Sequence, residues 1–469
     1  MQKKGAKKVA NVQELKQYKN LHFIGIGGTS MSGIAQILKH WGYNVTGSDA
    51  NASDNIEKLI NSNIHVTIGS NPSSINNADL VIYSAAIHDT DPELSKAREL
   101  GIPTIERGPF LGELTRSFRN TISIAGTHGK STTSAMVSMC FIEAKQDPTI
   151  QIGANIPAIN GNYRLGNSEN FIIEACEYSD SFLNFTNKAE IILNIDNDHL
   201  DYFKNLDNIK DAFIKFVKLL PDDGILVYNA DDENSSHISK YTKAKSITFG
   251  VKNKSANFIA KNISYDKNGF PTFDVYHNNT FYKTIKLSIP GEHNVLNALS
   301  CIALCNEFGL DKIDIKNALA KYTGVQRRFE YIGKIKNAKV FDDYGHHPTE
   351  IKAVADAMHK KHFNHSWVVF QPHTYSRTIE HLEEFAEVLT NFDNIIITDI
   401  YAARETNTYG ISSKDIITRI EKLGRKAYYI SNFDDIIDFI KRNVQDNDII
   451  LTQGAGTVTK IAHKLVEEE

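Results

Sequence analysis

The strongest constraint on the fold is a strand that runs into a glycine-rich or polar loop, a pattern that restarts three times along the chain. The three apolar runs cover residues 21–26, 121–125 and 338–341. Between them, short apolar strands alternate with amphipathic helices, which favours parallel sheets in an α/β architecture. A chain of 469 residues is long enough for about three such domains. The predicted domains are 1–118, 119–325 and 326–469.

The central domain contains a segment with a different pattern. Between residues 246 and 289, segments of period two flank Asn268-Gly269 and Asn278-Asn279. Such dipeptides between alternating segments are typical of β-hairpins. We therefore expect antiparallel strands appended to the main sheet of this domain.

Composition excludes several classes of partner. The formal net charge is −4, which gives no electrostatic reason to expect a nucleic acid or an anionic membrane. No apolar run approaches the length of a membrane span. The first 20 residues carry six lysines without a following apolar region, so no signal peptide is expected.

The four cysteines are Cys140, Cys176, Cys301 and Cys305, and none forms a C-x-x-C pair. Cys301 and Cys305 lie on an apolar helical stretch, where buried packing is favoured over metal binding. This usage fits a reducing cytoplasm.

The first glycine loop, FIGIGGTSMSGIA at residues 23–35, follows a strand and opens a helix. A second strand at 43–45 leads to Asp49, 24 residues after Gly25. This is the layout of a βαβ unit whose glycines admit a pyrophosphate and whose acid bonds a ribose. Ser30 replaces the last glycine of the fingerprint. An NAD(P) cofactor, a UDP-sugar and a turn needed only for close packing all remain open.

The second loop, GTHGKSTT at residues 126–133, has the order of a phosphate cradle but lacks the first glycine, because Ile124 stands there. Backbone N–H groups would face phosphate oxygens, Lys130 would reach the β and γ groups, and Ser131 would offer its hydroxyl to Mg²⁺. A helix expected from Thr132 would direct its positive end at the anion. The alternative is an exposed lysine in a turn, with Ser131 as a helix cap.

Two further residues favour the nucleotide interpretation. Glu174 ends the strand at 171–173, and His199 follows the strand at 191–195. Ligands bind at the carboxyl ends of strands in open α/β sheets, so both side chains are candidates for a metal beside the phosphates. Taken singly, each could be an ordinary loop residue.

Eight motifs then follow one another between residues 23 and 378: GIGGTSMSGIA, AGTHGKST, EACEYSDSF, NIDNDHLDYF, GEHNVLNAL, GVQRRFE, DDYGHHPTEI and FQPHTYSRT. Together they resemble the Mur ligases, most closely the members that add L-alanine. The resemblance implies a Rossmann-like N-terminal domain for the UDP-sugar, a central P-loop ATPase-type domain, and a Rossmann-like C-terminal domain for the amino acid. It also implies that the shortened loop is this family's own phosphate cradle.

The resemblance implies site residues by motif. Those for the UDP-sugar are Gly25, Gly27, Gly28, Thr29, Ser30, Asp49, Ser84 and Ala85. Those for ATP are Gly126, Thr127, His128, Gly129, Lys130, Ser131, Thr132, His293, Asn294, Asn297, Arg327 and Asp343. Those for the amino acid are Tyr344, His346, His373 and Arg377. The metal ligands are Ser131, Glu174 and His199, and the catalytic set is Lys130, Glu174, His199, Arg327, His346 and Arg377.

The implied reaction joins L-alanine to the lactyl carboxylate of UDP-N-acetylmuramate. ATP activates the carboxylate as an acyl phosphate, with Mg²⁺ or alternatively Mn²⁺ as the ion. The implied setting is peptidoglycan precursor synthesis, and so cell wall biogenesis, cell shape and cell division, by a cytoplasmic monomer or weak homodimer. Three positions depart from the pattern of many relatives and bear on amino-acid binding: Thr374, Arg404 and Thr457.

Three alternatives remain at this stage. A sister ligase would add a peptide to the same UDP-sugar. A nicotinamide-dependent oxidoreductase would use the first glycine loop but leave Lys130 and Glu174 without a role. A nucleotide-gated binding protein would turn over ATP without responding to the UDP-sugar.

Overall fold

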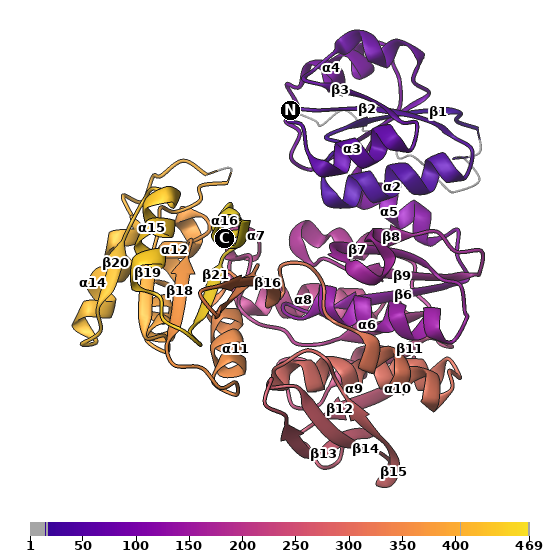
Figure 1. Cartoon of the computed structure of the whole chain (residues 1–469). Coiled ribbons are helices and arrows are strands. Elements are labelled where there is room, and N and C mark those ends of the chain that lie inside the picture. Colours follow the sequence, from indigo (N-terminus) through magenta and orange to yellow (C-terminus); the bar gives the residue numbers. More distant parts are fainter. Residues whose placement is uncertain (1–14, 16, 404, 468–469) are drawn as a thin grey trace. The chain divides into compact units, whose positions relative to one another are not determined.

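The computed structural model describes residues 15, 17–403 and 405–467. Figure 1 shows the chain, which divides into two units by its internal contacts. Of the described residues, the first unit comprises those up to 256 together with 300–314, and the second comprises 257–299 and those from 315 onward.

The first unit begins with a five-stranded parallel sheet of order β3-β2-β1-β4-β5. Its strands are β1 (Asn20–Ile24), β2 (Asn44–Asp49), β3 (His65–Ile68), β4 (Leu80–Tyr83) and β5 (Thr104–Glu106). Its helices are α2 (Thr29–His40), α3 (Asp54–Asn61), η1 (Pro72–Asn77), α4 (Pro92–Glu99) and α5 (Arg107–Thr115). Helical crossovers between parallel strands confirm the α/β prediction for this region.

The second sheet of this unit has the order β12-β11-β10-β6-β9-β7-β8, in which only β7 and β8 are antiparallel. The strands are β6 (Asn120–Ala125), β7 (Thr149–Ile156), β8 (Gly161–Arg164), β9 (Asn170–Glu174), β10 (Ala189–Ile192), β11 (Ile225–Asn229) and β12 (Lys245–Gly250). The helices are α6 (Lys130–Glu143), η2 (Pro157–Ile159), η3 (Tyr178–Asn184), α7 (Leu200–Phe203), α8 (Leu206–Val217) and η4 (Ile238–Tyr241). The central strands β6, β9 and β10 are almost wholly buried, as expected for a parallel sheet covered on both faces.

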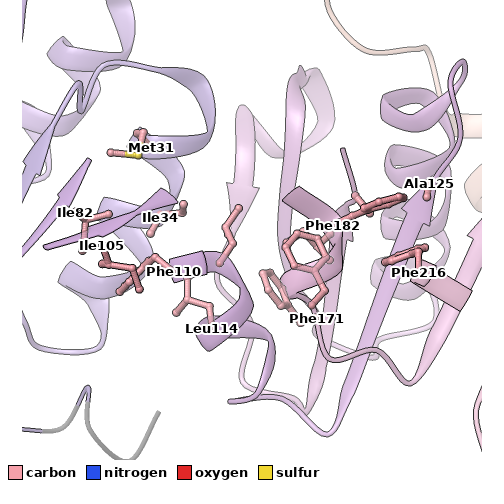
Figure 2. Close-up of a cluster of buried hydrophobic side chains, with 14 of the residues drawn as sticks. Met31, Ile34, Ile82, Ile105, Phe110, Leu114, Ala125, Phe171, Phe182 and Phe216 are labelled. Atoms are coloured by element: carbon pink, nitrogen blue, oxygen red, sulfur yellow. The ribbon is translucent and has the colours of Figure 1, made fainter. Parts of the chain in front are cut away.

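One hydrophobic cluster connects these two sheets (Figure 2). Ile34 of α2 and Phe110 of α5 belong to the same cluster as Phe171 of β9 and Phe182 of η3, and all four are buried. Full burial of a side chain of this size stabilises a fold by roughly 1.5–3 kcal/mol. The two glycine loops are therefore carried by one continuously packed body.

The second unit contains three antiparallel strands and a six-stranded sheet. The first group is β13 (Phe258–Tyr265), β14 (Pro271–His277) and β15 (Thr280–Lys286), which confirms the predicted hairpins. The six-stranded sheet has the order β16-β17-β21-β18-β19-β20. Its strands are β16 (Glu330–Ile335), β17 (Ala338–Asp343), β18 (Ser366–Phe370), β19 (Asn394–Ile397), β20 (Ala427–Tyr429) and β21 (Ile449–Gln453).

The helices that follow β17 contribute to two buried clusters of apolar side chains in this unit. They are α11 (Pro348–Met358), α13 (Leu382–Leu389), α14 (Ser413–Lys422), α15 (Phe433–Asn443) and α16 (Thr459–Glu467), while the short α12 (Tyr375–Glu380) adds no residue to either cluster. Two other helices have residues in both units: α9 (Glu292–Glu307) and α10 (Lys312–Lys321).

Some element boundaries differ from the sequence expectation. Helix α6 begins at Lys130, two residues earlier than expected, because Gly129 takes the left-handed conformation that caps it. Strand β10 ends at Ile192 rather than at residue 195. Strand β16 was not predicted, and it pairs antiparallel with β17 through a tight turn at Lys336 and Asn337, both with positive φ.

Among the described residues, we find no helix with the length and apolar character needed to cross a membrane.

Candidate active site

The phosphate loop connects β6 to α6 through four residues, 126–129. Gly126 and Gly129 have φ angles of 139° and 88°, which side-chain-bearing residues rarely adopt. A Cβ at Gly126 would lie 2.9 Å from the Cβ of Leu193. Glycine at these positions lets the chain turn sharply and directs the amino end of α6 at the loop, which is the arrangement that binds anions.

The loop is held by residues that follow β10. The backbone N–H of His128 donates to Oδ1 of Asn194 (2.8 Å), and Nδ2 of Asn194 donates to the His128 carbonyl (3.0 Å). The backbone N–H of Asp196 donates to Oγ1 of Thr127 (2.9 Å). These bonds hold the loop in shape through groups of the protein itself.

Lys130 is the first residue of α6, and its side chain is 13% exposed. Its Nζ donates to the carbonyls of Gly126 (2.6 Å) and Thr127 (3.0 Å) and to Oε1 of Glu177 (3.1 Å). Burial opposes the charge, but the carboxylate of Glu177 more than offsets it and raises the pKa of Lys130. The lysine is therefore a permanent cation beside the loop.

Ser131 and Glu174 meet as the sequence predicted. The Ser131 hydroxyl donates to Oε1 of Glu174 (3.1 Å), while Oε2 of Glu174 accepts from the Gly153 N–H (2.8 Å). His199 has a left-handed backbone and places its Nε2 4.0 Å from Oε1 of Glu177. One hydroxyl and two carboxylates form a donor set that suits a hard divalent cation, with an imidazole at its edge.

Glu177 was missed by the sequence analysis. Its side chain is only 2% exposed, and it connects Lys130 to His199. The available signal was an acid three residues after Glu174 in the motif EACEYSDSF.

The first glycine loop folds as a βαβ turn. The N–H of Gly25 donates to the Ser48 carbonyl (2.8 Å), and the N–H of Gly27 donates to Oδ2 of Asp49 (2.8 Å). Gly28 immediately precedes α2, which begins at Thr29. The structure therefore brings Asp49 to the glycines, as predicted.

Ser84 and Ala85 follow β4, next to this loop. A Cβ at Gly25 would lie 3.2 Å from the Cβ of Ser84. Two side chains that the sequence analysis missed also reach the start of α2. Asn162 donates to the Thr29 carbonyl (2.7 Å), and Arg107 donates to the Ser30 hydroxyl (3.4 Å).

In the second unit, Arg327 lies beside the end of β17. Its Nε donates to Oδ2 of the buried Asp342 (3.1 Å), and its Nη2 donates to the Gly454 carbonyl (2.7 Å). The guanidinium lies 4.9 Å from the ring centroid of Tyr344. Arg327 also has a φ of 58°, a strained conformation of the kind that concentrates at functional sites.

Asp343 is buried at the end of β17. Oδ1 accepts from the Gly345 N–H and from Nε2 of Gln453 (both 2.7 Å), and Oδ2 accepts from the Phe329 N–H (2.8 Å). Burial nevertheless raises the pKa of Asp343 to about 6.

The four residues predicted for the amino acid lie together. The ring centroids of His346 and His373 are 5.3 Å apart, and those of Tyr344 and His346 are 5.5 Å apart. Nη1 of Arg377 lies 3.3 Å from Nδ1 of His373. One guanidinium and two imidazoles thus line one patch, which suits a small carboxylate.

The predicted adenine residues lie at the start of α9. His293 is exposed, whereas Asn294 and Asn297 are buried. The Asn297 amide donates to Oδ1 of Asn294 (3.0 Å), and the Asn294 amide donates to the Pro290 carbonyl (2.6 Å).

The departures from the family pattern have structural roles where they are described. The Thr374 hydroxyl accepts from the Arg377 N–H (3.4 Å) at the start of α12, and the Thr457 hydroxyl accepts from Nε2 of Gln371 (3.3 Å). Arg404 lies outside the described residues.

In a comparison with known protein families, three family models match successive segments of this chain. They are "Mur ligase family, catalytic domain" over residues 20–119, "Mur ligase middle domain" over 124–305, and "Mur ligase, glutamate ligase domain" over 327–456.

Similar proteins span nearly the whole chain. The UDP-N-acetylmuramate–L-alanine ligase of Acetivibrio thermocellus is 44% identical and covers 97% of both chains. That of Caldanaerobacter subterraneus subsp. tengcongensis is 45% identical over 97% of this chain and 99% of the relative. Among solved structures, the UDP-N-acetylmuramate-alanine ligase MurC from Thermotoga maritima has a TM-score of 0.83 at 30% identity, covering 96% of this chain and 99% of the other. A murein peptide ligase from Psychrobacter arcticus has a TM-score of 0.71 at 25% identity, covering 95% and 98%.

Proposed function

This chain belongs to the Mur ligase family, and on that premise we propose that it is a UDP-N-acetylmuramate–L-alanine ligase. It forms an amide bond between L-alanine and the lactyl carboxylate of UDP-N-acetylmuramate, with ATP as the activating substrate, in peptidoglycan precursor synthesis. The observation that carries the ATP-dependent chemistry is the pre-formed phosphate loop with Lys130 and the adjoining Ser131–Glu174 pair. The identity of about 44% to L-alanine ligases over nearly the whole chain narrows the substrate.

The reaction has two steps. The lactyl carboxylate attacks the γ-phosphate of ATP, which gives an acyl phosphate and ADP. The amine of alanine then attacks the activated carbonyl, and phosphate leaves. Positioning and charge neutralisation supply most of the barrier lowering in such phosphoryl transfers.

The phosphate loop acts on the first step. Backbone N–H groups at the start of α6 hold the phosphates, and Lys130 offsets the charge on the transferring group. Ser131, Glu174 and His199 would hold Mg²⁺, with Glu177 adjacent, and a bound divalent cation would neutralise phosphate charge. The contact between the Ser131 hydroxyl and the Glu174 carboxylate supports this assignment. Mn²⁺ is the alternative ion.

The remaining nucleotide contacts lie in the second unit. We assign Arg327 to the phosphates, Asp343 to the ribose, and His293, Asn294 and Asn297 to the adenine. Because Asn294 and Asn297 already bond each other and the Pro290 carbonyl, they would support the adenine pocket mainly by fixing its wall.

In the second step, alanine would be bound by the patch that consists of Tyr344, His346, His373 and Arg377. The fork of Arg377 matches the alanine carboxylate, and His373 at 3.3 Å orients that fork. His346 is the candidate base for the alanine ammonium, since its ring lies beside that of His373.

The UDP-sugar is assigned to the first glycine loop. The glycines admit the pyrophosphate, Asp49 reaches the ribose, and Ser84 with Ala85 lines the neighbouring strand end. The domain division that accompanies these roles is 1–118 for the UDP-sugar, 119–325 for ATP and 326–469 for alanine. The enzyme would act in the cytoplasm as a monomer or weak homodimer, in a pathway that serves cell shape and division.

Phosphate release tests this proposal. The purified chain with Mg²⁺, ATP and UDP-N-acetylmuramate should release phosphate when L-alanine is added, and much less with L-serine, glycine or a tripeptide. A preference for the tripeptide would instead identify the sister ligase. Turnover that ignores the UDP-sugar would overturn the assignment as a ligase.

A further inference from the structure

Three of the four cysteines meet in the core of the first unit, and none of the three is among the residues assigned to the reaction. Cys140 lies on α6, and Cys301 and Cys305 lie one turn apart on the same face of α9. The sulfur of Cys301 is 3.6 Å from that of Cys140 and 3.9 Å from that of Cys305, and the three sulfurs all lie within 4.8 Å of one another. All three side chains are 0% exposed. The expectation of buried packing is confirmed for Cys301 and Cys305, and the sulfurs also share one centre.

The spacing of the sulfurs suits a single thiophilic ion. Zinc–thiolate bonds are about 2.3 Å long, so three sulfurs around one such ion lie roughly 3.5–4 Å apart. The separations of 3.6 and 3.9 Å fall in this range. Soft thiolate donors select thiophilic ions over hard ones such as Mg²⁺.

Burial decides which thiophilic ion fits. A site with no exposed surface disfavours any net charge, because a buried charge loses its hydration. Three thiolates leave a net charge of −2 with Cu⁺ and −1 with Zn²⁺, but none with a trivalent ion. The neutral product is therefore favoured in this environment.

We propose that Cys140, Cys301 and Cys305 form a binding site for a trivalent thiophilic ion of the arsenite or antimonite class. The neutral hydroxide As(OH)₃ reacts with three thiols to give As(SR)₃ and three waters. Three As–O and three S–H bonds break, three As–S and three O–H bonds form, and no oxidation state changes. The product ties α6, which starts at the phosphate loop, to α9, whose first turn carries the GEHN motif.

Neighbouring contacts support a site that is already assembled. Phe141 of α6 and Phe308, just beyond α9, pack with ring centroids 5.5 Å apart. Because these aromatic side chains hold the two helices together, the thiols need no large rearrangement to converge on one ion.

The test uses the full-length protein, reduced and freed of reductant, titrated with sodium arsenite and observed by native mass spectrometry. The expected adduct has the mass of one arsenic atom less three hydrogens, which reports three As–S bonds. Binding should also raise the Tm, since the ion binds the folded chain. Neither the adduct mass nor the Tm depends on ligase activity. A negative result would therefore contradict the arsenite site without bearing on the proposed ligase function.

Variants identify the ligands. Cys140→Ala, Cys301→Ala and Cys305→Ala should each abolish the three-hydrogen adduct and weaken arsenite binding by roughly 100-fold or more, because the third bond is intramolecular. Cys176→Ala is the matched control and should retain the adduct. Circular dichroism of each variant establishes that it is folded, and any one folded cluster variant suffices.

Three results would overturn the proposal. The first is no adduct with the wild-type chain. The second is an adduct that survives loss of a cluster cysteine or requires Cys176. The third is zinc binding more tightly than arsenite to the same protein, which would contradict the charge argument.

Discussion

Lys130 is the residue on which the proposed phosphoryl transfer most depends. Replacing it with alanine removes the cation that offsets charge on the transferring group. We expect Lys130→Ala to lower kcat about 10²–10³-fold or more, the scale for losing an electrostatic stabiliser. Alanine-dependent phosphate release measures this, with the exposed Lys254→Ala as control. Near-normal turnover of Lys130→Ala would contradict the assignment.

A substitution at Arg377 should affect the binding of alanine much more than that of ATP. Its fork is assigned to the alanine carboxylate, so Arg377→Ala should raise the KM for alanine roughly 10- to 100-fold and that for ATP far less. Arg377→Lys should recover part of the loss, since it keeps charge without the fork. Initial-rate kinetics with each substrate varied in turn provide the measurement. Equal effects on both KM values would refute the role.

The raised pKa of Asp343 should make the stability of the folded protein depend on pH. Burial raises its pKa to about 6, above its unfolded value, so the folded state holds the proton more tightly. This contribution is complete below about pH 4 and is lost as the pH rises through 6, in total about 3 kcal/mol. The free energy of unfolding of the wild type should therefore fall relative to that of Asp343→Asn between pH 4 and 7. Denaturant titrations of both proteins across this pH range measure the difference in the free energy of unfolding. If this difference did not change with pH, the raised pKa of Asp343 would be disproved.

Among the elements, the turn between β6 and α6 depends on glycine. A Cβ at Gly126 would meet Leu193 and the Asn194 backbone, and the φ of 139° is strained for alanine. Gly126→Ala should cost about 1–3 kcal/mol of stability and lower activity. Gly161→Ala is the matched control, because a Cβ there has no neighbour closer than 3.9 Å. Thermal unfolding and phosphate release test both variants, and equal behaviour would contradict the argument.

The same element shows what the sequence could and could not predict. A buried strand, two glycines and a lysine indicated the phosphate loop, since these depend on local spacing. Glu177 was missed because its partners, Lys130 and His199, are 47 and 22 residues away, and nothing local marks their convergence. Strand β16 was missed because it has few buried residues, and its place depends on pairing with β17. The cysteine cluster likewise joins α6 to α9 across 161 residues.

At the scale of the whole molecule, the proposed reaction needs residues from both units. The phosphate loop belongs to the first unit, whereas Arg327 and the alanine patch belong to the second. Reacting atoms must come within about 3–3.5 Å, so we expect substrate binding to change the arrangement of the units. Small-angle scattering should show a changed radius of gyration with Mg²⁺, a non-hydrolysable ATP analogue and UDP-N-acetylmuramate. Lys130→Ala should respond less at the same concentrations, and an unchanged radius for the wild type would argue against this expectation.

The contacts of Lys130 also bear on how ATP enters. Its ammonium already donates to two carbonyls and to a carboxylate of the protein itself. A triphosphate that binds the loop must therefore compete with these groups for the Lys130 ammonium. The affinity for the nucleotide then reflects the difference between the attraction of Lys130 to the phosphates and its attraction to its partners in the protein. The substitution Glu177→Gln would weaken the ion pair within the protein. Lys130 would then be freer to bind the nucleotide, but its ammonium group would be positioned less firmly.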